Sequence, residues 1–278
     1  MLNFTATRAS PRGSGQRRNP FGGWLARAWP SVLGALTPSA KVRVRVLLAN
    51  RAASTAFQPI RSLDTGVIAG VEALTRFTGL AMRSPEAMFA DAASAGCLVE
   101  LEFLAMEAAL KAAVALPAPL YVSINLSPQA CLDPRLENLI RNSPVKPSRV
   151  VLELTEHSPV ADYAALRARL ARVRKSGLRI AVDDTGAGFA SMRHVLQLKP
   201  EFIKLDRDMV SGIDTHDVKK AFGTAMVEFA ASIGATLVAE GIETEGELAT
   251  LREIGVPAGQ GYLLGRPAAA PSEWVERN

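Results

Sequence analysis

Runs of apolar and β-branched residues recur along the chain, and stretches with helical character lie between them. Eight such runs predict β-strands at residues 55–63, 67–77, 119–126, 149–155, 179–184, 202–206, 236–242 and 259–264. Four stretches predict helices at residues 41–53, 161–176, 215–233 and 244–254. The stretch 161–176 is the clearest, because Leu166, Leu170 and Val173 fall on one face and Gly177 follows as a stop signal.

The alternation of strand and helix predicts an α/β fold with a parallel sheet, and eight strands in this order predict a closed, TIM-like (β/α)8 barrel. One connection departs from that pattern, since only Asp64, Thr65 and Gly66 join the first two predicted strands. A link this short can close a hairpin but cannot make a parallel crossover. We therefore expect the first strand to run antiparallel to the rest.

The first 40 residues differ in composition from the rest, and we expect a basic, disordered leader at residues 1–40 before a barrel at residues 41–278. The leader is rich in Arg, Gly, Ser and Pro. Apolar residues in the piece 21–36 leave two alternatives open. One is a helix that binds a membrane surface or a partner, and the other is an export signal after Arg17 and Arg18.

Charge and cysteine content exclude some classes of function for the barrel. Residues 1–50 carry eight basic side chains and no acid, whereas residues 51–278 carry 24 basic and 27 acidic side chains, a net charge of −3. The excess of basic side chains lies in the leader and not in the barrel, so we expect no DNA or RNA binding by the barrel. No apolar run of about 18 residues occurs, so we expect no transmembrane helix. Cys97 and Cys131 form no metal-type pair, which favours reduced thiols in a cytoplasm.

Polar side chains stand within or at the ends of strands that should be apolar. They are Glu72, Asn125, Glu153, Asp183, Asp184, Lys204, Glu240, Glu243 and Gln260. One such acid can be a strand end that faces solvent. Acids or Asn from five separate strands are better explained by a site at the C-terminal mouth of a barrel, where these strand ends converge.

The residue types of this cluster indicate a metal site. Carboxylates and one Asn form an all-oxygen set, which favours Mg²⁺ or Mn²⁺ over zinc. Like charges at short range raise one another's pKa, so these acids cannot all be ionised together without cations. The adjacent Asp183 and Asp184 suit two ions, because one carboxylate can bridge while its neighbour binds the second. Two ions about 3.5–4 Å apart are the usual device for phosphoester hydrolysis.

Eight sequence motifs occur in the order found in EAL-domain proteins, and the chain resembles that family from about residue 42 to about residue 268. The motifs are FQPI, VEALTR, SINLSP, ELTE, VDDTGAG, FIKLD, AEGIET and QGYLLGRP. The resemblance implies a barrel with an antiparallel first strand. It also implies hydrolysis of cyclic di-GMP to linear 5′-pGpG with two Mg²⁺ or Mn²⁺, with Ca²⁺ expected to inhibit. A catalytically weak cyclic di-GMP receptor is the alternative.

The resemblance also implies a role for each matching residue. The first metal would be bound by Glu72, Asn125, Glu153 and Asp183, and the second by Asp183, Asp184 and Glu240. The expected catalytic residues are Lys204, which resembles the residue that helps to activate the attacking water, with Glu72, Asp183 and Glu240. The expected substrate-binding or water-network residues are Gln58, Leu74, Arg76, Glu243 and Gln260. Arg76 has a chemical reason for its place, since a guanidinium can grip a phosphate.

The loop after the acidic pair departs from the family pattern. Thr185 stands where the family usually has Phe, and Phe189 where it usually has Tyr. Glu156 resembles the acid that stabilises this loop. The resemblance also leaves a homodimer possible, with contacts made through this loop. Asp206 has two interpretations, a site acid or a packing acid paired with Lys204.

Overall fold

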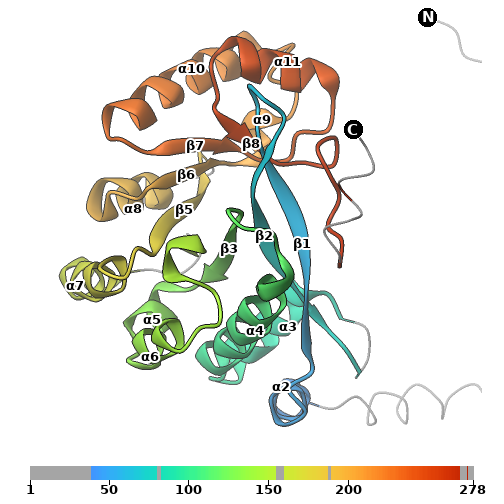
Figure 1. Ribbon diagram of the computed structural model, residues 1–278, viewed down its shortest axis with the longest axis vertical. Coiled ribbons are helices and arrows are strands. Elements are labelled where there is room, and N and C mark those ends of the chain that lie inside the picture. Colours follow the sequence, from blue (N-terminus) through green and yellow to red (C-terminus); the bar gives the residue numbers. More distant parts are fainter. Residues whose placement is uncertain (1–38, 80–82, 155–159, 187–188, 270–273, 275–278) are drawn as a thin grey trace, which may run out of the picture. The chain divides into compact units, whose positions relative to one another are not determined.

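The computed structural model describes residues 39–79, 83–154, 160–186, 189–269 and Trp274. Its centre is a closed barrel of eight strands joined in chain order (Figure 1). The strands are β1 (Ala53–Ser62), β2 (Ile68–Phe77), β3 (Tyr121–Leu126), β4 (Val150–Leu154), β5 (Arg179–Thr185), β6 (Phe202–Leu205), β7 (Thr236–Ala239) and β8 (Ala258–Gly259). The predicted eight-stranded barrel is confirmed.

The first strand runs against the others, as the short link predicts. β1 pairs antiparallel with both β2 and β8, and every other neighbouring pair is parallel. Gly66 in the connecting turn has a φ of 72°, a left-handed conformation that glycine adopts without steric cost. In this register Gln58 lies directly opposite Glu72, so the hairpin brings both residues to the same level of the barrel.

Helices surround the barrel on its outer side (Figure 1). They are α2 (Ala40–Ala49), α3 (Pro85–Ser94), α4 (Leu98–Ala112), α5 (Pro128–Leu132), α6 (Arg135–Arg141), α7 (Tyr163–Arg174), α8 (Phe189–Leu198), α9 (Arg207–Val210), α10 (Asp217–Ser232) and α11 (Glu245–Glu253). The predicted helices at 161–176, 215–233 and 244–254 correspond to α7, α10 and α11.

Side chains at the helix starts explain where several of these elements begin. Asp162 precedes α7 and accepts hydrogen bonds from the backbone N–H groups of Ala164 and Ala165. Thr244 and Glu247 form a reciprocal capping box at the start of α11. These caps satisfy N–H groups that have no partner within the helix.

The predicted end of the first helix is wrong. The helix expected over residues 41–53 covers Ala40–Ala49. Arg51 adopts a φ of 47°, which ends helical geometry, and Ala53 already pairs in β1.

The predicted length of the last strand is also wrong. Instead of residues 259–264, β8 contains only two residues, Ala258 and Gly259. The chain then passes so close to Ile242 that a Cβ on Gly261 would overlap the Ile242 backbone. A strand continuing straight on would not make this approach, which only glycine permits.

An apolar layer closes the barrel at the amino ends of its parallel strands. Tyr121 and Phe202, the first residues of β3 and β6, pack within the barrel with Ile60 and Val151. The guanidinium of Arg179 lies 5.1 Å from the ring centre of each aromatic residue, in cation–π geometry. The carboxyl ends of these strands are therefore the side on which an open site can form.

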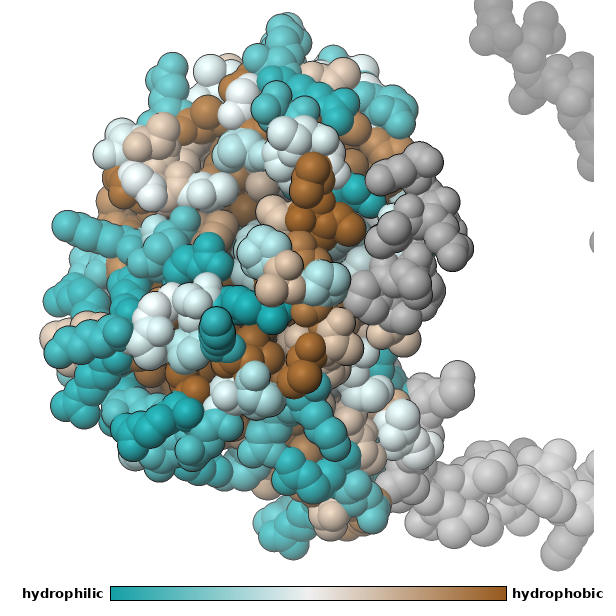
Figure 2. All heavy atoms as spheres, in the orientation of Figure 1, coloured by the Kyte–Doolittle hydropathy of each residue, from teal (hydrophilic) through white to brown (hydrophobic). Residues whose placement is uncertain are grey.

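Polar side chains cover most of the surface seen in Figure 2, as expected for a barrel whose helices turn their apolar faces inward. None of the helices within the described ranges is long and apolar enough to span a bilayer. The compact unit that holds the barrel begins at Ala40. Apart from Ser39 and Ala40, the expected leader at residues 1–40 lies outside the described residues, so its disorder stays a prediction.

Candidate metal-dependent active site

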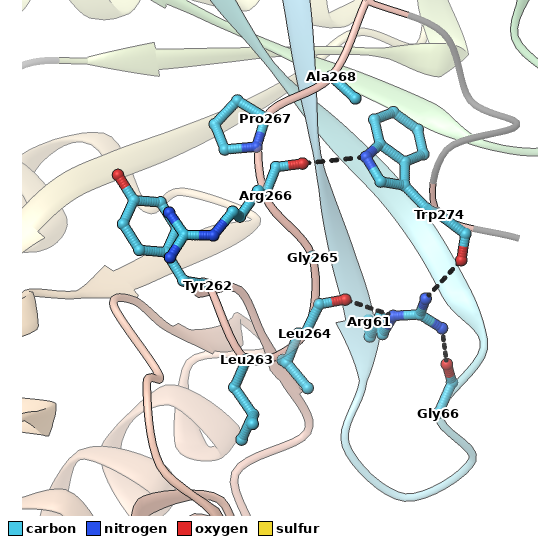
Figure 3. A pocket seen from close by; sticks show the side chains of 10 residues that line it. All are labelled: Arg61, Gly66, Tyr262, Leu263, Leu264, Gly265, Arg266, Pro267, Ala268 and Trp274. Atoms are coloured by element: carbon cyan, nitrogen blue, oxygen red, sulfur yellow. Dashed lines mark hydrogen bonds between the residues drawn. The ribbon is translucent and has the colours of Figure 1, made fainter. Parts of the chain in front are cut away.

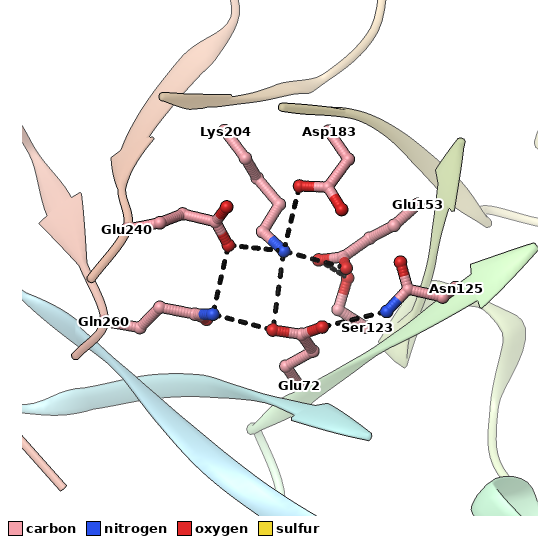
Figure 4. Close-up of polar contacts among 8 residues, drawn as sticks. All are labelled: Glu72, Ser123, Asn125, Glu153, Asp183, Lys204, Glu240 and Gln260. Carbon is pink, nitrogen blue, oxygen red and sulfur yellow. Dashed lines mark hydrogen bonds and ion pairs between the residues drawn. The ribbon is translucent and has the colours of Figure 1, made fainter. Parts of the chain in front are cut away.

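Charged and amide side chains that lie on, or directly after, strands β2 to β8 converge inside the barrel (Figure 4). Glu72 comes from β2, Glu153 from β4, Asp183 from β5 and Lys204 from β6. The remaining members are Ser123 and Asn125 of β3, Glu240 directly after β7 and Gln260 directly after β8. Parallel strands place their carboxyl ends at one rim, which is why residues so far apart in sequence meet here.

The ammonium group of Lys204 lies at the centre of the cluster, within reach of four carboxylates. Its Nζ is 2.7 Å from Glu240, 2.9 Å from Glu153, 3.3 Å from Asp183 and 3.4 Å from Glu72. The Lys204 side chain is only 3% exposed, so these charges act on one another with little screening by water. Lys204 therefore holds the inner faces of four strands together electrostatically.

Neutral side chains complete the hydrogen bonding of the acids. Asn125 Nδ2 donates to Glu72 at 2.8 Å, and Gln260 Nε2 donates to Glu72 at 2.6 Å and to Glu240 at 3.1 Å. The Ser123 hydroxyl donates to Glu153 at 2.5 Å. Both oxygens of Glu72 and both of Glu153 thus have partners, which fixes the orientation of these carboxylates.

The pKa values within the cluster show that one lysine does not balance its acids. Burial raises the pKa of Glu153 to about 8, with Glu72 and Asp183 adding to the rise and Lys204 opposing it. Burial likewise raises the pKa of Glu240 well above its usual range. Burial also acts to raise the pKa of Glu72, but Lys204 and the amide donors outweigh it and lower that pKa. The pKa of Lys204 is well above its usual value, because its four carboxylates outweigh burial.

Three carboxylates offer oxygens close enough together to bind one cation. Asp183, Asp184 and Glu240 can each present an oxygen within 4.8 Å of the other two, and this is the one such group among the described residues. Asp183 and Glu240 are 13% and 14% exposed, against 1% for Glu153, so the group lies toward the open end of the site. Asp184 has a φ of 50°, an uncommon conformation for a non-glycine residue.

The donor set fits a hard divalent cation. It is made of oxygen ligands, it carries more negative than positive charge, and the buried Oε1 of Gln260 accepts no hydrogen bond within the described part of the chain. Added positive charge would lower the raised pKa values of Glu153 and Glu240. Glu72 and Glu153, both expected for the first ion, turn their oxygens inward in this structure: Glu72 accepts from Asn125 and Gln260, and Glu153 accepts from Ser123 and Lys204.

Several residues expected to bind substrate make their printed contacts outside the Lys204 cluster. Gln58 donates to the backbone oxygen of Gly265 at 3.1 Å, and Leu74 is half-buried on β2. Arg76 is exposed and donates to the backbone oxygen of Thr75.

Glu243 pairs with Arg207 at 2.9 Å. The roles of these rim residues stay predictions, and Glu156 lies outside the described residues.

The sequence does not single out Ser123, and one of the two interpretations of Asp206, a pairing with Lys204, is wrong. Ser123 stands two residues before Asn125, so the two-residue period of a strand places both on one face and could have revealed it. Asp206 does not pair with Lys204. It accepts from the backbone N–H of Asp208 and caps α9.

A second hollow, of about 300 Å³, lies outside the acidic cluster (Figure 3). Its lining includes Arg61, Tyr262, Arg266 and Trp274. Arg61 donates to the backbone oxygens of Leu264, Gly66 and Trp274, so its guanidinium ties the chain after β8 to the hairpin. Its lining within the described ranges includes no acid, in contrast to the cluster around Lys204.

Comparisons with known proteins identify relatives of this chain. The family model described as the EAL domain matches residues 41–267. An uncharacterized signaling protein of Caulobacter vibrioides is 33% identical over 218 residues, which cover 76% of this chain and 27% of that protein. Cyclic di-GMP phosphodiesterase PdeL of Escherichia coli is 29% identical over 255 residues, 86% of this chain and 69% of that protein. The chain spans 27–31% of the first three curated relatives.

Solved structures resemble the barrel closely. The PaMucR phosphodiesterase in its c-di-GMP complex has a TM-score of 0.75 at 26% identity, over 84% of this chain and 99% of that one. The calcium and cy-diGMP complex of Klebsiella pneumoniae BlrP1 has a TM-score of 0.70 at 29% identity, over 78% of this chain and 56% of that one.

Proposed function

Because this chain belongs to the EAL domain family, we propose that it is a phosphodiesterase that hydrolyses cyclic di-GMP to linear 5′-pGpG with two divalent cations. The observation that carries the proposal is the acidic cluster around Lys204 with the carboxylate group Asp183, Asp184 and Glu240. PdeL, which matches most of this chain, is named a cyclic di-GMP phosphodiesterase, and PaMucR was solved in complex with c-di-GMP.

Each part of the cluster has a task in this reaction. Asp183, Asp184 and Glu240 would hold one cation, and Glu72, Asn125, Glu153 and Asp183 would hold the other. Bound cations would activate a water and neutralise charge on the phosphodiester. Mg²⁺ or Mn²⁺ suits oxygen ligands of this kind.

The protein side chains orient the reactants. Lys204 can donate a hydrogen bond to the attacking water while its other protons hold Glu153 and Glu240. Exposed Arg76 can bind a phosphate oxygen at the rim. The water oxygen bonds to phosphorus as the bond to the 3′ oxygen breaks. The phosphate stays on the 5′ oxygen, and the proton lost by the water is balanced by one taken up at the leaving oxygen.

Chromatography of cyclic di-GMP incubated with the purified protein and Mg²⁺ or Mn²⁺ tests this function. We expect 5′-pGpG to form and EDTA to stop its formation. A protein that binds the nucleotide but releases no pGpG in either metal would be the receptor alternative, and the hydrolase proposal would then be wrong. Homodimer formation and a cytoplasmic location stay predictions.

A further inference from the structure

The short helix α9, which follows Lys204 and β6, is held firmly from three directions. Asp206 caps it, and Lys219 Nζ donates to the backbone oxygens of Asp208 and Ser211 at 2.6 Å each. The buried carboxylate of Glu247 on α11 accepts from the N–H of Gly212 at 2.9 Å, just past the end of α9. The backbone of α9 is therefore held in place, and its side chains start from fixed positions.

Arg207, the first residue of α9, lies across the loop that carries Glu240 and Glu243. Gly241 directly follows Glu240 and has a φ of 67°. A Cβ at this position would meet the Arg207 side chain, with its Cβ at 2.8 Å and its Cδ at 2.9 Å. The Arg207 stem thus occupies the space that the glycine leaves. Its guanidinium then reaches Glu243 at 2.9 Å.

The loop after β5, on the other side of β6, also approaches α9 closely at a glycine. Gly186, two residues after Asp184, has a φ of 115°, and a Cβ there would meet Met209 Cγ at 2.7 Å. Helix α9 therefore packs against both the loop after β5 and the loop after β7, next to the strand and loop that carry the candidate cation group.

The backbone and the side chain of Glu243 are held by different residues. Its backbone N–H donates to Glu247 at 2.9 Å, as does the N–H of Thr244 at 3.0 Å. These bonds fix the main chain but leave the side chain able to rotate. Within the part of the chain that the structure describes, the ion pair with Arg207 is the contact that directs the Glu243 carboxylate.

We infer that Arg207 is a positioning residue, which directs Glu243 toward cyclic di-GMP and so sets the affinity for this substrate. The inference rests on the proposed function. The side chains of Arg207 and Glu243 are 60% and 40% exposed, and an exposed ion pair contributes little to folding stability. Loss of the pair should therefore change substrate affinity and leave the fold intact.

Steady-state kinetics and calorimetric binding of cyclic di-GMP test this role. Arg207→Ala should raise KM and Kd by about tenfold, the effect of one charge-assisted contact, with kcat within about threefold. Arg207→Lys should recover part of the affinity, because it keeps the charge and part of the stem. The double variant of Arg207→Ala and Glu243→Ala should be no weaker than Glu243→Ala alone, because the two residues act through one contact.

Lys220→Ala is the matched control. It breaks an exposed ion pair, in which Lys220 Nζ lies 2.8 Å from Glu253, and this pair joins α10 to α11 and not to the cluster. It should keep the KM and Kd of the parent. If the parent is active but Arg207→Ala matches this control, Arg207 has no positioning role. A parent that neither binds nor hydrolyses cyclic di-GMP would overturn the proposed function and this inference with it.

Thermal unfolding tests the contact itself without any nucleotide. Gly241→Ala should lower the Tm of the parent more than it lowers the Tm of Arg207→Ala, because the Arg207 Cβ is in the way in both proteins but Cγ and Cδ are in the way only in the parent. The two effects should differ by about 2–4 °C. Equal effects in both backgrounds would show that the Arg207 stem beyond Cβ does not lie over Gly241, and the inference would be wrong.

Discussion

Replacing Lys204 with Met tests the electrostatic centre of the molecule. Methionine keeps much of the length and volume of the side chain but removes the charge that four carboxylates share. We expect three effects: lower stability without metal, a larger stabilisation by Mn²⁺ than in the parent, and loss of turnover. Each follows from removing a buried cation next to several acids.

The size of the stability effect follows from the distances. At an effective dielectric constant of about 20, a pair of charges about 3 Å apart attracts by roughly 5–6 kcal/mol before desolvation is counted. The Glu240 and Glu153 oxygens lie at 2.7 and 2.9 Å from Nζ. Removing one partner of a buried pair costs about 3–5 kcal/mol net. For a chain of this size the Tm in EDTA should fall by roughly 6–20 °C.

The penalty should grow as pH rises. Once the lysine charge is gone, the cluster can relieve repulsion only by taking up protons, and these become scarce at high pH. Thermal unfolding in EDTA at pH 6 and pH 9, repeated with saturating Mn²⁺, measures this dependence. Lys220→Met serves as a control for losing an exposed lysine.

Turnover should fall at least about a hundredfold, or roughly 2.7 kcal/mol of transition-state stabilisation. Binding of cyclic di-GMP in Ca²⁺ should stay within about threefold of the parent, since an ammonium has no lone pair to bind metal. A Lys204→Met protein that matches the parent in EDTA stability would refute the charge argument. One that keeps the parental kcat would refute the assignment of Lys204 to the attacking water.

Four further predictions use the same protein. Glu72→Ala should cut turnover at least about a hundredfold while circular dichroism stays native, because a buried carboxylate costs stability as well as serving function. The pKa of Glu153 is raised from 4.5 to about 8, so its contribution to stability is complete below pH 4.5 and lost as pH rises through about 8; chemical denaturation of the metal-free protein should show this fall. Ca²⁺ should bind yet support little pGpG formation, because its bonds of about 2.3–2.6 Å exceed the 2.0–2.1 Å of Mg²⁺; equal rates at saturation would exclude a tight two-metal site. Deleting residues 1–38 should leave kcat within about threefold, and a hundredfold loss in a folded truncation would make the leader part of the enzyme.

The barrel was predictable because its signals are local. Apolar runs of strand length, glycine stops such as Gly177 and a link of three residues after Leu63 are all visible in the sequence, and each follows from backbone geometry. Positions where the chain leaves regular structure through a tertiary contact were not predictable. The turn after Gly259 is an example, because it depends on the close approach of Gly261 to Ile242.

The members of the site were visible as polar residues in apolar strands, but their pairing was not. Asp206 and Lys204 are two residues apart in one motif, which suggested an ion pair. In the structure β6 ends at Leu205, and Asp206 caps the helix that follows. Spacing along a strand shows which side chains share a face, but it does not show which acid across the barrel is nearest.

The charge balance of the cluster links its folding to its proposed chemistry. Five carboxylates gather at this site, and Lys204 contacts four of them. Without Lys204, folding would require most of these acids to be protonated or a metal to be present. With Lys204 alone, Glu153 and Glu240 still keep raised pKa values, so the folded cluster retains a demand for positive charge. One lysine can therefore balance part of the negative charge without metal and still leave the site attractive to the cations of the proposed function.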